Sequence, residues 1–310
     1  MTQAFLTALL AGAVTAGIPL LLAGLGEQVS QRAGVLNIGL EGMMLMGAYA
    51  GFVVSLQSGN PWFGFAAGLG GGMAVAALMA QFAVRWGLNQ IVIGIALLLG
   101  VEGLTAILHH LSFAQTYPRL PAATTWPLPG LVHLPLIGPA LFDRPPVAYA
   151  AFLLVGLMAW LDRRTHLGLA FRAAGDSPSA LDAAGVDVLR TRAIAVLIAG
   201  ACAGLGGAFM AIVGAGIFVP FMTNGGGFIA IVLAMLARGR PLMVLLGALL
   251  FGACLSATTA LQVVGIDAPT DIVQMLPFAV VLLVLALFGD RGSLPASLGE
   301  SWSRGNPLSR

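Results

Sequence analysis

The sequence predicts an all-α protein, a polytopic helical bundle integral to a membrane. Only 8% of the 310 residues are charged, 59% are hydrophobic, and the mean hydropathy is +0.97. A soluble domain carries about 25% charged residues, so this chain lacks the residues for a water-facing surface. The few charges also separate long apolar runs, each near the ~20 residues that cross a bilayer. This composition excludes a cytosolic enzyme and a disordered chain, and a net charge of +2 offers no basic surface to nucleic acid.

The charges divide the chain into about nine crossings, with a range of eight to ten. The first stretch has no basic n-region of a signal peptide and is therefore expected to be a retained helix with a kink at Pro19. Residues 110–146 are rich in proline and are expected to form an irregular outer loop with room for a short interfacial helix. The simple expected spans are Met1–Gly26, Val35–Gln57, Trp62–Val84, Leu88–His109, Val147–Leu161, Leu242–Val264 and Ile272–Phe288.

The remaining crossings come from Ala193–Ala237, a run without a single charge. As one helix this run would be about 67 Å long, twice the ~30 Å of the hydrocarbon core. It must therefore turn, and Gly214, Gly216, Pro220 and residues 224–227 supply a turn. The second limb, Phe228–Ala237, is too short to cross alone, so part of the run is expected to be re-entrant and buried in protein.

The arginines indicate the orientation. All 14 basic residues are arginines. With residues 162–192 placed in the cytoplasm, only Arg119 and Arg144 of the 14 remain outside, which is a strong positive-inside bias. Nine crossings then put the C-terminus in the cytoplasm and the N-terminus outside. The whole chain, 1–310, is expected to be one transmembrane domain, with 110–146 as the outer loop and 290–310 as a cytoplasmic tail.

Glu41 is a carboxylate inside an apolar run, where ionisable groups usually face a bundle interior or a wet cavity. Three roles stay open from the residues alone. Glu41 ties helix ends together, lines a translocation path, or relays protons. Asn37 is similar but less costly to bury. Asn89 directly follows a basic stretch at the membrane interface, which favours a helix cap over a ligand contact.

The polar stretch 162–192 carries the signals of one short capped helix. Gly175-Asp176-Ser177-Pro178 is a helix start, because Ser177 or Asp176 can be the N-cap and proline suits the first helical position, so a short helix is expected over Pro178–Ala184. Gly185 suits a left-handed C-cap, and Asp187 can cap the next membrane helix. Two interpretations stay open: an ordinary solvated loop, or a docking helix for a cytoplasmic subunit. The small residues presented by the docking helix are Ala180, Ala183 and Ala184.

No catalytic or metal site is expected. The chain has no lysine, so it contains neither a Schiff-base lysine nor the GxxxxGK[ST] sequence of a P-loop. If ATP drives this protein, another subunit must hydrolyse it. The adjacent His109 and His110 cannot face each other on a helix to hold a metal. Glycines at four-residue spacing, such as Gly47/Gly51 and Gly200/Gly204, are interpreted as helix-packing positions.

Several of these segments together resemble a known family. Ala33–Gly47 (AGVLNIGLEGMMLMG), Gly87–Ala96 and Gly225–Ala230 with Arg238–Pro241 resemble motifs of membrane subunits of ATP-binding-cassette (ABC) importers for simple sugars and nucleosides. These subunits belong to the branched-chain amino acid/ribose permease group. Leu167–Gly175 and Ala180–Gly185 are similar to the loop that contacts the ATPase in that family.

The resemblance implies a bacterial inner-membrane permease subunit without cofactors of its own. It would work with a like or sister permease, a cytoplasmic ATPase that binds ATP and Mg at two sites, and an extracytoplasmic substrate-binding protein. Its cargo would be a nucleoside, a purine or a simple sugar. Under the resemblance, the candidates for polar groups facing the path are Asn37, Glu41, Asn89 and Asn224. The candidates for ATPase coupling are Gly175, Ser177, Pro178, Ala180, Ala183, Ala184 and Gly185.

The rival interpretation is an ATP-independent secondary transporter or channel. Such a protein needs linked protonatable groups across the membrane. Only Glu41 and Glu102 lie deep in the expected spans. An ATPase that accompanies the chain would separate the two interpretations.

Overall fold

A computed structural model describes residues 2–114, 116–130, 132, 137–263 and 294–303, together with 275, 279, 280, 282, 283 and 286. The predicted all-α membrane bundle is confirmed, and a two-stranded sheet is the one addition among these residues. The helices are α1 Thr2–Arg32, α2 Leu40–Ser58, α3 Pro61–Met79, η1 Ala80–Arg85, α4 Gln90–Phe113, α5 Ile137–Leu141, α6 Pro146–Arg164, α7 His166–Asp176, α8 Pro178–Ala183, α9 Val188–Phe209, η2 Met210–Ala215, α10 Gly226–Ala237 and α11 Pro241–Val263.

Within the described residues, six helices are long and apolar enough to cross a membrane, and two shorter apolar segments, Gly226–Ala237 and Pro241–Ala257, follow them. These six support a multi-pass protein but not the expected count of nine. The last expected span, Ile272–Phe288, lies for the most part outside the described residues. The six are Phe5–Arg32, Leu40–Ser58, Pro61–Arg85, Gln90–Phe113, Pro146–Arg164 and Val188–Ala215.

The first helix is longer than the sequence predicts. The expected span ended at Gly26, before the first charge, whereas α1 continues to Arg32. Helix geometry continues because the next residues are good helix formers and the first residue with left-handed backbone is Gly34, at φ +85°. The last turns of α1 are nevertheless buried, and Glu27 and Ser30 are fully inaccessible. Buried polar groups of this kind require partners from elsewhere in the fold.

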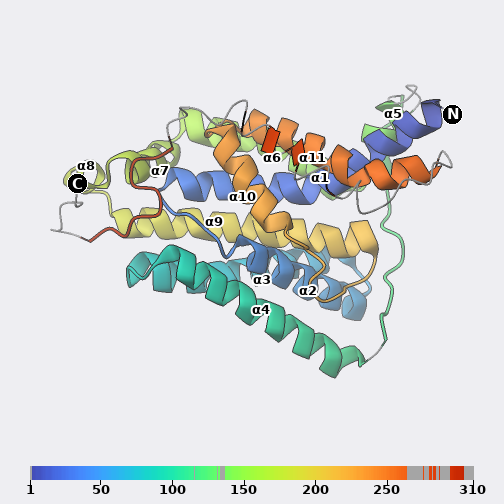
Figure 1. The fold of residues 1–310 in the computed structure, drawn as a ribbon, viewed down its shortest axis with the longest axis horizontal. Helices are drawn as coiled ribbons and strands as arrows, with labels where there is room; N and C mark the ends of the chain where they lie inside the picture. The colour runs from blue at the N-terminus through green and yellow to red at the C-terminus, as the bar shows by residue number, and fades with distance from the viewer. Residues whose placement is uncertain are drawn as a thin grey trace.

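Helix α9 forms the centre of the bundle and packs against α1, α2 and α3. Figure 1 shows these long helices running side by side, with α4 along one edge and α6 with α11 on the opposite side. The α7–α8 pair and the last described residues lie at one end, and α5 lies with the N-terminus at the other. The fold therefore separates the polar stretch 162–192 from the Pro-rich loop by the length of the bundle.

Glycine pairs set the close approach of α9 to its neighbours, as the four-residue spacings predict. A Cβ added to Gly47 would overlap the backbone of Gly204, and one added to Gly72 would overlap the carbonyl of Gly200. Gly207 lies equally tightly against the backbone of Met44. Without Cβ atoms the helix backbones touch directly, which maximises van der Waals contact where lipid supplies no hydrophobic drive.

The expected turn in the uncharged run is confirmed. Helix α9 and its π-helical extension η2 end at Gly216, whose φ is +66°. Residues 217–225 then turn back into α10, which begins after Gly225 at φ +81°. Helix α10 has 12 residues and is thus about 18 Å long. Its first residues, Gly226 and Gly227, are buried in protein, where the free N–H groups of a helix start need acceptors.

The stretch 162–192 contains two helices, not the single one that the sequence predicts. Helix α8 has the predicted cap residues, with Ser177 at the N-cap and Gly185 at φ +83° just beyond its end. Helix α7 precedes it and was not expected. It begins because Thr165 Oγ1 accepts the N–H of Gly168 at 3.2 Å, and it packs the apolar face that includes Phe171 inward. An amphipathic helix of this kind carries enough polar residues to resemble a loop in sequence.

The Pro-rich loop 110–146, which the sequence predicts to lie outside, folds back on itself more than expected. Strand β1, Trp126–Pro127, pairs antiparallel with β2, Asp143–Arg144, with Trp126 opposite Arg144. The short helix α5 lies between the two strands in the chain and packs against α1. The short helix that the sequence allows in this loop is therefore present as α5.

Candidate functional site

Glu41 caps the buried N-terminus of α10. Its side chain leaves the first turn of α2, is 3% exposed, and accepts the N–H of Gly225 with Oε1 at 2.9 Å. Its Oε2 accepts the N–H of Gly227. A carboxylate at a helix N-terminus satisfies free N–H groups and opposes the positive end of the helix dipole. Of the three roles that the sequence leaves open for Glu41, this arrangement corresponds to the structural one, in which the carboxylate ties helix ends together.

The corner between α1 and α2 is held by buried polar groups that the sequence analysis did not identify. Glu27 Oε1 accepts the side-chain amide of Gln31 at 3.0 Å and the backbone N–H of Asn37 at 3.3 Å. Gln31 Nε2 also reaches the carbonyl of Ile231 in α10, and Gln90 Oε1 accepts the N–H of Leu36. The i, i+4 spacing of Glu27 and Gln31 was the available signal.

Asn37 is fully buried in this corner, between α1 and α2. Its Nδ2 lies 3.3 Å from Met43 Sδ, and its Oδ1 has no hydrogen-bond partner among the described residues. Asn37 thus lies in the connection to α2, four residues before Glu41, and it presents an acceptor that its surroundings leave unused.

Asn224 lies in the turn before α10 and lines a large cavity. This cavity, named the outer cavity after the side of the bundle on which the sequence predicts the loop 110–146, has a volume of about 770 Å³ and lies between the first half of α1, the turn 217–225 and α11. Its lining is mostly apolar, with a few polar side chains. The polar lining residues are Thr15, Arg144, Thr223, Asn224 and Ser256. A mostly apolar cavity of 300–1,000 Å³ with a few fixed polar groups is the usual form of a small-molecule site.

Arg144 is fixed at the wall of the outer cavity by its own contacts. Its Nη1 donates to Thr15 Oγ1 at 2.8 Å and its Nε donates to the carbonyl of Ala140 at 2.6 Å. Burial lowers the pKa of this guanidinium, and the neighbouring Asp143 opposes that effect. The contact connects the outer loop to α1, so the loop forms one wall of the cavity.

Asn89 is not brought together with the other three candidates. Its Oδ1 accepts the N–H groups of Ile91 and Val92 at 3.0 and 3.2 Å, which makes it the N-cap of α4. The side chain is exposed and does not line the outer cavity. Its neighbour Gln90 is the buried residue that contacts the α1–α2 corner. Glu41 therefore contacts Gly225, the residue after Asn224, at the start of α10, whereas Asn37 lies four residues before Glu41 and Asn89 lies apart.

The candidate coupling residues form one surface at the opposite end of the bundle from α5. Pro178 is buried and anchors α8, whereas Ser177, Ala180, Ala183, Ala184 and Gly185 are exposed. Gly175 is buried at the end of α7, where a Cβ would overlap the carbonyl of Arg32. The exposed face of α8 therefore carries small side chains, which would let a partner protein pack closely against the helix.

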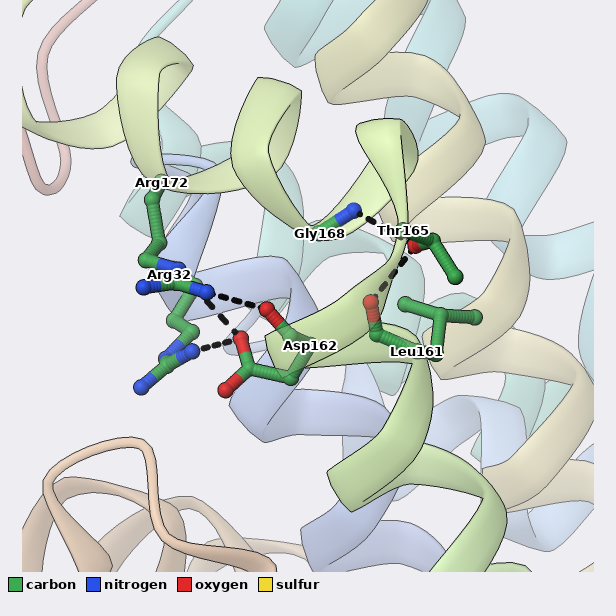
Figure 2. Close-up of polar contacts among 6 residues, drawn as sticks. All are labelled: Arg32, Leu161, Asp162, Thr165, Gly168 and Arg172. Carbon is green, nitrogen blue, oxygen red and sulfur yellow. Dashed lines mark hydrogen bonds and ion pairs between the residues drawn. The ribbon is translucent and has the colours of Figure 1, made fainter.

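Ion pairs connect α7 to the end of α1. Figure 2 shows Arg32 and Arg172 pointing at Asp162, at the end of α6, and Thr165 capping α7 beside them. Arg32 contacts the Asp162 carboxylate, Arg172 Nε lies 3.6 Å from the same oxygen, and Arg172 Nη2 donates to the Asp162 carbonyl. A movement of α7 would thus displace the end of α1 and the α1–α2 corner that follows it.

Arg192 adds a second connection. It is 2% exposed, and its guanidinium donates to the carbonyls of Ala174 at 3.0 Å and of Glu300 at 2.6 Å. The described segment 294–303 is held further by Ser297 N–H to Gly175 and Gly299 N–H to Gly34. These bonds join the end of α7, the α1–α2 corner and the segment 294–303.

Comparisons with known proteins show the family to which the chain belongs. Residues 9–285 match the family model of the branched-chain amino acid transport system/permease component. The chain is 43% identical over 252 residues to a putative glucose ABC transporter permease protein of Haloferax volcanii, covering 81% of this chain and 76% of the relative. It is 31% identical over 300 residues to the guanosine ABC transporter permease protein NupQ of Bacillus subtilis, covering 93% of each.

A third relative is the nucleoside ABC transporter permease protein NupC of Lactococcus lactis, which is 30% identical over 294 residues, 92% of this chain and 93% of the relative. No solved structure matches the chain. The family match covers nearly the whole length, including the α1–α2 corner, Glu41, the α7–α8 pair and α10. The chain therefore belongs to the family of permease components of branched-chain amino acid transport systems.

Proposed function

We propose that this chain forms the translocation path of an ABC importer and that a separate cytoplasmic ATPase drives it. The observation that carries the proposal is the outer cavity, whose far side is closed by the α10 start that Glu41 holds. A path for a small polar solute needs a cavity that opens to one side and a removable barrier. The start of α10 provides such a barrier, and its position depends on α2 because Glu41, which caps it, belongs to α2.

The cargo class is a nucleoside or a simple sugar. The relatives' names divide between glucose and nucleosides. The cavity volume of about 770 Å³ accommodates either. Hydroxyl and amide groups of Thr15, Asn224 and Ser256 supply the hydrogen-bonding partners that ribose or hexose hydroxyls require, and the apolar remainder suits the faces of a nucleobase.

The exposed face of α8 supports the coupling part of the proposal. An ATPase dimer that binds ATP and Mg at two sites would close against α8, and α7 would carry the movement to α1 through Asp162, Arg32 and Arg172. ATP has to bind the closed ATPase more tightly than the open one, because only differential affinity shifts a two-state equilibrium. The permease itself has no catalytic step in this scheme.

The other partners and the topology follow from the same proposal. A second permease, identical or related, would complete the path, and an extracytoplasmic binding protein would deliver the cargo. The bias of 12 inner to two outer arginines supports a cytoplasmic C-terminus in a bacterial inner membrane. With the nine crossings that the apolar runs predict, the N-terminus then lies outside. Labelling of single cysteines placed near either end, in a background without Cys202 and Cys254, measures the side of each end.

The cavity is tested by uptake of labelled guanosine and labelled glucose into cells that express the full transporter. Asn224→Gly removes the side chain and leaves the backbone free to keep φ near +44°. We expect the KM for the true cargo to rise about three- to tenfold, the loss of one or two neutral hydrogen bonds. Asn89→Ser keeps the cap of α4 outside the cavity and serves as the control. Equal KM values for all three proteins would contradict the assignment of the cavity.

The coupling surface is tested by co-purification of the ATPase. Ala180→Trp and Ala183→Trp put a bulky ring on the exposed face of α8, and both should reduce the amount of bound ATPase while the permease inserts normally. Leu153→Trp, on a side chain of α6 that is 76% exposed, is the matched control. Normal recovery of the ATPase with both alanine variants would refute docking at α8.

A further inference from the structure

A second, smaller cavity lies near the coupling end of the bundle, and the function proposed above uses two of its lining residues, Arg32 and Arg172, as links between helices but does not use the cavity itself. Its volume is about 160 Å³, and it lies between the end of α1, α7, the α10–α11 turn and the segment 294–303. One water occupies about 30 Å³ in the liquid, so the cavity has room for a group of several heavy atoms. The lining residues that carry the argument are Gln28, Arg32, Arg172, Asp176 and Arg238.

The lining of this cavity has an excess of positive charge. Figure 2 shows two of the cations, Arg32 and Arg172, sharing the single carboxylate of Asp162. The cations that line the cavity are Arg32, Arg172 and Arg238, and Asp176 is the carboxylate in the same lining. Arginines thus outnumber carboxylates among the lining residues. An anionic group would therefore be attracted to it.

Two lining residues also carry a buried donor without an acceptor. Gln28 is 4% exposed, and its Nε2 has no hydrogen-bond partner among the described residues. Arg172 Nε makes the 3.6 Å ion pair but no hydrogen bond. A buried donor without an acceptor destabilises the fold. Both donors belong to residues of the same lining, so a ligand with several acceptor oxygens would satisfy them together.

We propose that this cavity binds a phosphate group, supplied either by the headgroup of an anionic phospholipid or by free phosphate. Arginine guanidinium groups pair with phosphate oxygens in a bidentate manner, which neutral or singly hydroxylated ligands cannot match. Basic pockets between transmembrane helices on the cytoplasmic side are typical sites for lipid headgroups. The bound phosphate joins α1, α7 and the α10–α11 turn, where Gly239 lies directly against the Arg32 side chain.

The test uses the full chain, purified in a neutral detergent and freed of lipid. The probes are phosphatidylglycerol, phosphatidylcholine as the lipid without net charge, and inorganic phosphate. Binding is measured by native mass spectrometry and by the shift of the thermal unfolding midpoint. Arg238→Gln and Gln28→Met each remove one lining donor, and Arg240→Gln removes the same charge from the same turn but outside the cavity.

We expect one phosphatidylglycerol per chain, bound more tightly than phosphatidylcholine, with affinity reduced about tenfold in Arg238→Gln and unchanged in Arg240→Gln. Binding of inorganic phosphate with the same pattern of variants identifies free phosphate as the source. Gln28→Met provides the comparison if Arg238→Gln does not fold. The proposal is overturned if neither phosphatidylglycerol nor inorganic phosphate binds. It is also overturned if Arg240→Gln weakens binding as much as the two lining variants do.

Discussion

Replacement of Glu41 tests how the barrier at α10 is built. In the structure the carboxylate accepts two backbone N–H groups, from Gly225 and Gly227. Glu41→Leu has a similar size but accepts neither, so two N–H groups at a buried helix start lose their partner. A hydrogen bond to a charged group contributes about 1.5–3 kcal/mol. The two bonds together therefore lower the free energy of local opening by about 3–6 kcal/mol.

Hydrogen–deuterium exchange of the backbone amides measures this loss directly. Each 1.4 kcal/mol corresponds to a factor of ten in the opening equilibrium. The amides of residues 225–227 should thus exchange at least ~100-fold faster in Glu41→Leu. Glu41→Gln keeps one acceptor oxygen and turns a donor toward the second N–H, so its effect should be about tenfold. Uptake of cargo should fall in the same order.

Glu102→Leu is the matched control, since it removes a half-buried carboxylate from α4, a helix that does not cap α10. It should leave exchange at residues 225–227 unchanged. The reasoning is refuted if exchange in Glu41→Leu stays within threefold of the wild type. Equal acceleration in the Gln and Leu variants would instead indicate that the charge of Glu41 matters and its geometry does not.

Three further predictions concern packing and the coupling end. Gly207→Ala should destabilise the protein by about 1–3 kcal/mol in thermal unfolding, because its Cβ meets the Met44 backbone; Gly100→Ala, in open space, should be neutral or stabilising, and equal midpoints would contradict the packing. Arg192→Gln should speed amide exchange at residues 297–299 about tenfold or more, because it weakens the bonds to the carbonyls of Glu300 and Ala174. Arg190→Gln, on the surface, should leave that exchange unchanged. Unchanged exchange in both variants would mean that Arg192 does not hold the segment 294–303. Gly239→Ala should be more destabilising than Gly185→Ala, because both have left-handed φ but only at Gly239 would a Cβ displace the Arg32 guanidinium, which is paired with Asp162; similar losses would refute that contact.

Features with a local cause were predictable from the sequence. Helix α8 was placed within one residue because Ser177-Pro178 and Gly185 are signals read over a few positions. The turn inside Ala193–Ala237 followed from a length that no single crossing can accommodate. The glycine spacings indicated close helix packing because a missing side chain has few other uses on a membrane helix.

Features with a distant cause were not predictable. Glu27 was taken as the end of a span, yet it is buried because Gln31 and the Asn37 amide provide partners at the corner. Asn89 and Gln90 have similar chemistry, and only the rotation of α4 decides that Gln90 faces inward. Arg192 counted as one of the cytoplasmic arginines, but its acceptor on Glu300 lies 108 residues further along the chain.

The central claim is that this chain is a gate without an energy source of its own, moved through α8 by a separate ATPase. The most direct test is accumulation of labelled cargo in proteoliposomes that contain the permease pair and the binding protein, with and without the ATPase and ATP. We predict accumulation against a gradient only when both the ATPase and ATP are present, and its loss in Ala180→Trp. Accumulation by the permease without the ATPase would contradict the claim.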